Sequence, residues 1–289
     1  MSERSGEKES FWEKIQWIDT RILYLLMWVV VIWPLISPIN LPIGIGRESK
    51  EYYDVIKEIP PGSKVVLSYD MSFSGLPELG PMSIATLHQL LGMDVKVYIC
   101  AFWNQGSNIA ADDIEALNPE VNYGKVYGVD YIHIGYNPRS EVGMTQFASD
   151  VYTAFPNDFI NNRPLGTYEI MEGVQTAADF DVLISIESGT PGSSEWVRQW
   201  VQPYGIPFLV GALGVSVPGV APYKNAGQIV AFIAGLRSAA EYELLAGRPA
   251  IAIAQQDPLS TTHVLVILFV IVGNLGYFFT RQERARRSG

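Results

Sequence analysis

The distribution of apolar and charged positions divides the chain into two apolar stretches and a long amphipathic middle. The first stretch runs from Ile22 to Gly46 and the second from Pro258 to Thr280, and neither contains an acidic or basic residue other than one histidine. At 1.5 Å per residue, each is long enough to cross a hydrocarbon layer of ~30 Å. The sequence therefore predicts two transmembrane helices, at 22–43 and 258–280, that anchor one domain.

Between these stretches, short apolar runs alternate with segments of helical period. Strands are predicted at five of the apolar runs: 65–69, 95–102, 131–136, 182–186 and 207–210. Helices are predicted at 80–91, 110–117, 144–155, 168–178, 194–201 and 226–245. Near-continuous apolar strands are typical of parallel sheets covered on both faces. We therefore expect an α/β fold, a Rossmann-like three-layer domain with a mainly parallel five-stranded sheet.

Basic residues around the second stretch predict the orientation in the membrane. Four arginines follow this stretch within seven residues, whereas the nearest basic residue before it is Arg248. Because short basic flanks stay in the cytoplasm, both termini are expected there and the domain outside. The predicted organisation has five parts: a cytoplasmic N-terminal segment with an interfacial helix (1–21), a transmembrane helix (22–43), an extracytoplasmic α/β domain (44–257), a second transmembrane helix (258–280) and a cytoplasmic arginine-rich tail (281–289).

Other interpretations of the apolar stretches stay open. The first could be a cleaved signal peptide, although an acidic segment precedes it and no small-x-small cleavage site follows. Either stretch could also be a buried core helix. Within the second, Asn274 is a polar amide between Gly273 and Gly276, a pattern that favours close helix packing with the first span or with another membrane subunit.

Charge and cysteine content narrow the class of protein. The formal net charge is −10, and an acidic domain repels phosphates, so we expect no nucleic acid as a partner. The single cysteine, Cys100, excludes an internal disulfide. A large extracytoplasmic domain without disulfides is consistent with an integral protein of a prokaryotic cell membrane, with the lipid bilayer as its first partner.

Polar side chains follow the predicted strands at the edge where open α/β sheets bind ligands. The candidate ligand-binding residues are Asp70, Ser72, Ser74, Asn104, Tyr136, Glu187, Ser188, Thr190 and Tyr223. Asp70 and Glu187 are also the candidates for catalysis and, if a metal is bound, for its ligands. The expected ligand is a small polar molecule; the alternative is that these are loop residues facing water.

Motifs for known chemistry are absent from the sequence. There is no Gly-x-x-x-x-Gly-Lys-Ser/Thr loop, no Gly-x-Gly-x-x-Gly after the first strand, no Gly-x-Ser-x-Gly elbow and no His/Cys metal spacing. No cofactor is therefore assigned. The sequence favours a membrane-anchored binding or scaffolding component of a membrane protein assembly. The alternative is a membrane-bound extracytoplasmic hydrolase or transferase that uses Asp70 and Glu187, with or without a metal.

Overall fold

The computed structural model describes residues 11, 18–37, 39, 43–248 and 250–287. They belong to two compact units, an α/β unit over 43–253 and an apolar unit built from the described parts of 1–42 and 254–289. Each unit is described by itself below.

The α/β unit contains a parallel sheet of six strands in the order β3-β2-β1-β4-β5-β6. The strands are β1 (Lys64–Asp70), β2 (Lys96–Ala101), β3 (Tyr131–Tyr136), β4 (Val182–Glu187), β5 (Phe208–Ala212) and β6 (Ala231–Ala234). This is the order of doubly wound α/β sheets, in which the chain reverses direction across the sheet between β1 and β4. The parallel α/β sheet predicted from the sequence is thus confirmed, with six strands instead of five.

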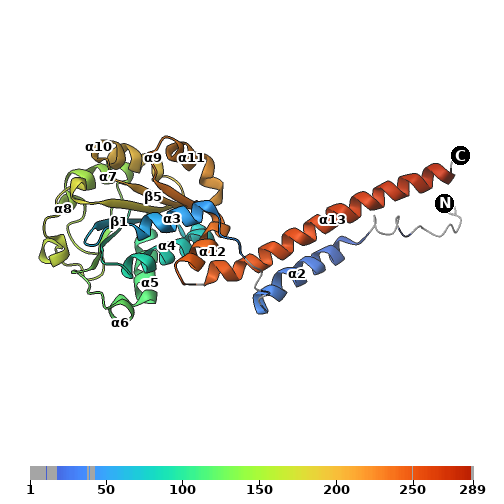
Figure 1. Cartoon of the computed structure of the whole chain (residues 1–289), viewed down its shortest axis with the longest axis horizontal. Helices are drawn as coiled ribbons and strands as arrows, with labels where there is room; N and C mark the ends of the chain where they lie inside the picture. The colour runs from blue at the N-terminus through green and yellow to red at the C-terminus, as the bar shows by residue number, and fades with distance from the viewer. Residues whose placement is uncertain (1–10, 12–17, 38, 40–42, 249, 288–289) are drawn as a thin grey trace. The chain divides into compact units, whose positions relative to one another are not determined.

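Helices cover both faces of the sheet (Figure 1). The longer ones are α3 (Arg47–Lys57), α4 (Leu76–Leu91), α5 (Gly106–Leu117), α7 (Ser140–Ser149), α11 (Val217–Asn225) and α12 (Gly235–Leu245). Shorter ones are α6 (Pro119–Tyr123), α8 (Val151–Ala154) and α9 (Ser193–Trp196), which continues through a π-helical turn (Val197–Val201) into α10 (Gln202–Tyr204).

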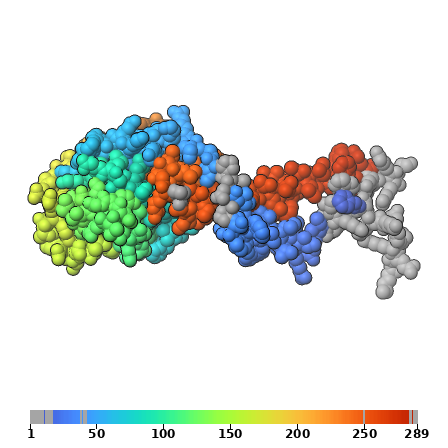
Figure 2. All heavy atoms as spheres, turned by 60° about the horizontal axis from the view of Figure 1, so that its bottom comes forward, coloured from blue at the N-terminus to red at the C-terminus, as the bar shows by residue number. Residues whose placement is uncertain are grey.

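Two apolar cores lie on opposite faces of the sheet because consecutive strand residues point to opposite sides. In β1, Leu67 joins the core under α3, α4, α5 and α12, whereas Val66 joins the core under α7, α8 and α9. On the first face, α3 and α4 (blue to cyan) and α12 (orange) pack together (Figure 2). The second core is aromatic, with Trp196 and Trp200 fully buried in it.

The sixth strand replaces the first part of a predicted helix. The segment 226–245 was expected to be one long helix, but β6 lies within its first half and α12 forms only its second half. Gly227 and Gly235 bracket the strand with φ values of +74° and +76°, a region that favours glycine. Alanine at both ends of β6 gives it weak β propensity, which is why the strand does not stand out in the sequence.

The helix predicted at 168–178 is also wrong. This segment consists of 3₁₀ turns, Glu169–Met171 and Ala177–Asp179 among them. Gly173, with φ +70°, separates these two turns. The apolar residues that suggested a helix, Ile170 and Val174 among them, are buried by irregular backbone instead.

The apolar unit contains α2 (Thr20–Ile36) and most of α13 (Ile251–Arg287). Among the described residues, one helical segment, Ile251–Gln282, is long and apolar enough to cross a membrane. The second predicted span lies inside it, although the helix continues through Pro258 instead of starting there. The hydroxyl of Thr261 on α13 donates to the carbonyl of Val30 on α2 (3.1 Å).

The first predicted span is shorter than expected and is not confirmed as a transmembrane helix. α2 has 17 residues and ends at Ile36, with Ser37 at its C-cap. Ser37 precedes a proline in the sequence, and residues before proline disfavour the helical region. The interfacial helix predicted within 1–21 lies outside the described residues, apart from residues 11 and 18–21.

Candidate functional site

The two candidate carboxylates lie side by side at the point where the strand order reverses. Asp70 ends β1 and Glu187 ends β4, and the register of the parallel pair sets them directly opposite each other. Both lie on the face covered by α9, with Ser185 two residues before Glu187 on the same side of β4. Open α/β sheets bind ligands in this crevice, beyond the carboxyl ends of the strands.

Asp70 is fully buried and surrounded by hydrogen-bond donors. Oδ1 accepts from the backbone amide of Phe102 (2.9 Å), and Oδ2 accepts from Trp196 Nε1 (2.7 Å) and Ser185 Oγ (3.1 Å). Burial raises the pKa of Asp70 to about 6, and the donors from Trp196 and Phe102 oppose a larger rise. Asp70 is therefore mostly ionised at neutral pH and ties β1, β2, β4 and α9 together.

Glu187 is buried too, with 4% of its surface exposed, and its hydrogen-bond donors come from Ser185 and Ser193. Oε1 accepts from Ser193 Oγ (2.6 Å), whereas the contact of Oε2 with Ser185 Oγ is 3.5 Å long. Burial raises the pKa of Glu187 to about 8; the Ser193 hydrogen bond opposes the rise and the nearby Asp70 adds to it. At neutral pH Glu187 is thus mostly a protonated carboxylic acid, which can donate a hydrogen bond.

One hydroxyl, that of Ser185, reaches both carboxyl groups. A hydroxyl has a single proton, so Ser185 can donate to only one of them at a time. Ionised Asp70 is the better acceptor, and it is also the nearer group. The proton of Glu187 then has two directions, toward the Ser185 oxygen or into the space beside Glu187.

That space is a cavity of about 470 Å³. Hydroxyl-bearing side chains line it on several sides, with Ser193 from α9, Ser216 from the turn after β5 and Tyr223 from α11. A volume of this size is within the range of small-molecule sites. The chain passes close to the acid here, since a Cβ on Gly192 would lie 2.3 Å from the Gly189 carbonyl oxygen and 3.0 Å from the Glu187 carboxyl group.

The other residues predicted from the sequence divide into three groups. Tyr223 lines the cavity with Glu187. Ser72, Ser74 and Ser188 do not line the cavity but join the loops after β1 and β4, with Ser188 Oγ accepting from the amide of Ser72 (3.1 Å) and Ser72 Oγ 2.8 Å from Ser74 Oγ. The remaining residues do not line the cavity: Asn104 and Thr190 are exposed, and Tyr136 packs against the core under α5.

Sequence reasoning did not select Ser185, Ser193 or Trp196. Ser185 had a usable signal, because a serine two residues before Glu187 in a buried strand must share its face. Trp196 had none, since its indole donates to a residue 126 positions away in the chain.

Metal and nucleotide chemistry fit this crevice poorly. No group of three or more His, Cys, Asp or Glu side chains suited to a metal occurs within the described residues. The two carboxyl groups of Asp70 and Glu187 are two possible ligands, and both oxygens of Asp70 already accept hydrogen bonds from protein donors. A phosphate would meet two buried acids here, although the strand order is one that dinucleotide-binding domains use.

Comparison of the chain with known protein families, with curated proteins and with solved structures gives no match.

Proposed function

We propose that the protein is a membrane-anchored binding component whose α/β unit holds a small, uncharged polar molecule in the crevice beside Glu187. The observation that carries this proposal is a buried acid, protonated at neutral pH, which lines a cavity of about 470 Å³. Among the side chains that the structure describes, only the Ser185 hydroxyl contacts its Oε2, at 3.5 Å. Buried polar atoms are ordinarily satisfied, so a poorly paired oxygen at a cavity wall favours a ligand or water partner.

The chemistry of the lining argues for a hydroxylated ligand. The acid of Glu187 donates, while Ser193, Ser216 and Tyr223 carry hydroxyls that can both donate and accept. Hydroxyl and carbonyl groups of a polyol or sugar complement such a surface. An anionic ligand would be disfavoured by the ionised Asp70 behind Glu187.

The experiment is isothermal titration calorimetry on the full chain in detergent, with glycerol, glucose and myo-inositol against ATP and NAD. The proposal expects heat from at least one polyol and none from the phosphorylated compounds. Gly219→Trp should abolish the signal, because Gly219 lines the cavity and has open space where a side chain would begin. Val121→Trp, at an exposed position on α6, is the control. Binding of NAD, or polyol binding that survives Gly219→Trp, would contradict the assignment.

Localisation forms part of the same proposal. The long apolar segment of α13 supports membrane anchoring, and the arginines that follow it support a cytoplasmic C-terminus. With α2 as a second crossing segment, the α/β unit would be extracytoplasmic. Thr261 and its bond to Val30 support pairing of the two helices.

Association with other membrane subunits would use α13. The side-chain amide of Asn274 donates to Val270 O of the same helix (2.7 Å), and no described residue donates to its side-chain oxygen. That oxygen could accept a hydrogen bond from a neighbouring subunit. Crosslinking in native membranes tests this: Asn274→Leu should lower the yield of crosslinked species, and an unchanged yield would argue against it.

A second candidate function, acid catalysis by an extracytoplasmic hydrolase or transferase, rests on the same protonated carboxyl group. An acid with a pKa of about 8 can protonate a leaving group at neutral pH, and the nearby charge of Asp70 would help to keep that pKa raised. Glu187→Gln separates the two functions, because it retains hydrogen bonding but cannot transfer a proton. Turnover of any bound compound that Glu187→Gln abolishes without loss of affinity would favour the enzyme.

A further inference from the structure

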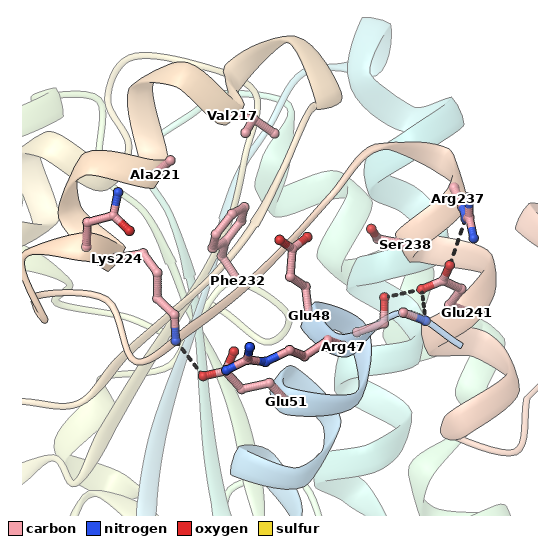
Figure 3. A pocket seen from close by; sticks show the side chains of 13 residues that line it. Arg47, Glu48, Glu51, Val217, Ala221, Lys224, Phe232, Arg237, Ser238 and Glu241 are labelled. Atoms are coloured by element: carbon pink, nitrogen blue, oxygen red, sulfur yellow. Dashed lines mark hydrogen bonds and ion pairs between the residues drawn. The ribbon is translucent and has the colours of Figure 1, made fainter. Parts of the chain in front are cut away.

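A second pocket lies beside the edge strand β6, between α3, α11 and α12 (Figure 3). Its volume is about 610 Å³. One wall is apolar, with Val217 and Ala221 on successive turns of α11 and Phe232 on β6. The other walls carry six charged residues: Arg47, Glu48, Glu51, Lys224, Arg237 and Glu241.

Four of these six charges are paired with one another. Lys224 Nζ lies 2.6 Å from Glu51 Oε1, and Arg237 Nε lies 2.9 Å from Glu241 Oε1. The remaining two, Arg47 and Glu48, make no side-chain hydrogen bond or ion pair within the part of the chain that the structure describes, and Figure 3 draws none for them. The pocket therefore presents one unpaired cation and one unpaired carboxylate beside an apolar wall.

The two unpaired groups point in different directions. They are consecutive residues in the first turn of α3, so their side chains leave the helix ~100° apart. In Figure 3 the Arg47 side chain extends toward the Lys224–Glu51 pair, while Glu48 extends toward Phe232. A ligand that meets both must carry its opposite charges at separate ends, with an apolar body between them.

The turn that holds Arg47 and Glu48 is fixed by a buried carboxylate. Glu241, 3% exposed, accepts from the Gly46 amide (2.9 Å) and the Ser49 hydroxyl (2.7 Å) as well as from Arg237. A Cβ on Gly46 would lie only 2.8 Å from Glu241 Oε2, so a larger residue here would displace this carboxylate. The pocket wall is thus organised before a ligand arrives, which lowers the cost of binding.

The same contact argues against a phosphate. A helix N-terminus ordinarily attracts anions, but at α3 the carboxylate of Glu241 already occupies that position. The charges lining the pocket also balance, which favours neither a simple anion nor a simple cation.

We propose that this pocket binds a small zwitterion with an apolar body, its carboxylate at Arg47 and its ammonium group at Glu48. The contact surface for that body is the Val217, Ala221 and Phe232 wall. This site is separate from the cavity at Glu187, and the two share no lining residue.

The test uses three probes with the same six-carbon chain: 6-aminohexanoate, hexanoate and hexylammonium. Calorimetry on the full chain in one detergent should show 6-aminohexanoate binding up to ~5-fold tighter than either half-charged probe, the gain expected from one partly exposed ion pair. Arg47→Gln should remove the advantage over hexylammonium, and Glu48→Gln the advantage over hexanoate. Both side chains are exposed, so neither change should impair folding.

Matched controls come from the same helix. Lys50→Gln and Asp54→Asn remove one cation and one carboxylate from an exposed i,i+4 pair on α3 that does not line the pocket. They should leave the order of the three probes unchanged, and they share any background from probe partitioning into detergent. Equal affinity for all three probes, no binding of 6-aminohexanoate, or equal effects of Lys50→Gln and Arg47→Gln would overturn the proposal.

Discussion

Replacing Glu187 with glutamine tests whether this buried acid keeps its proton in the folded protein. Glutamine has nearly the same shape and is neutral at every pH, so it imitates the protonated acid. The folded-state pKa of about 8 lies above the 4.5 of a free glutamate. A group whose pKa is raised by folding contributes its full stabilisation below its unfolded-state pKa. That contribution is lost as the pH rises through the folded-state pKa.

The size of the effect follows from these two pKa values. Between pH 5 and pH 7 the unfolded chain releases this proton while the folded protein still holds it. At ~1.4 kcal/mol per pKa unit, the wild type should lose about 2–3 kcal/mol of stability over this interval through Glu187 alone. Glu187→Gln should lack this loss. Asp70 and Asp113, whose pKa values burial also raises, titrate in both proteins and cancel in the difference.

The assay is urea denaturation of the full chain in detergent at pH 5 and pH 7, followed by tryptophan fluorescence. Trp196 and Trp200 are buried in the α/β unit, so their emission reports its unfolding. Glu195→Gln is the control, because that carboxylate pairs with Arg198 and accepts from the Gly192 amide. Glutamine should weaken these two contacts and so lower the stability at both pH values. If wild type and Glu187→Gln lose stability in parallel between pH 5 and 7, Glu187 is ionised in the fold and the reasoning fails.

Three further predictions concern the contacts that build the unit. Asp70→Asn should cost about 2–4 kcal/mol of stability and shift the tryptophan emission, because the NH₂ group of the new asparagine must face a donor such as Trp196 Nε1. Unchanged denaturation would contradict this. Glu243→Ala should cost about 1–2 kcal/mol and speed hydrogen exchange at the amides of Ala250, Ala252 and Ile253, which donate to that carboxylate at the start of α13. Gly106→Ala should prevent folding, as judged by circular dichroism, because its Cβ would lie 1.8 Å from a β1 carbonyl oxygen; Gly219→Ala, which meets open space, should change stability by less than ~1 kcal/mol.

The sequence predicts the sheet well where the strands are strongly apolar. Val65–Tyr69 and Val182–Ile186 stand out because burial on both faces demands continuous apolar residues, whereas the alanine-rich β6 resembles the helix that follows it. The segment 168–178 misleads for a related reason, since apolar residues at helical spacing can also be buried by 3₁₀ turns. The apolar residues of a segment predict that it is buried. Whether the segment forms a helix, a strand or 3₁₀ turns also depends on its glycines and on its packing, which the spacing of apolar residues does not show.

The site was predictable in part. Asp70 and Glu187 could be selected because each ends a buried strand, but only the strand order makes those two strands neighbours. Tyr136 also ends a strand, yet β3 is at the edge of the sheet, two strands away from β1. The hydroxyls of Ser193 and Ser216 come from α9 and from the 3₁₀ turn after β5, whose approach to Glu187 depends on tertiary packing.

Cysteine labelling in intact cells tests most directly the claim that the crevice opens to the outside of a membrane. Cys100, the chain's single cysteine, is buried, so the wild type should not react with a membrane-impermeant maleimide. Thr190→Cys adds an exposed thiol to the loop after β4, and Ser288→Cys places a second cysteine in the arginine-rich tail of the sequence. The account predicts that Thr190→Cys is labelled in intact cells and Ser288→Cys only after permeabilisation. Labelling of Ser288→Cys in intact cells, with Thr190→Cys protected until the membrane is opened, would contradict it.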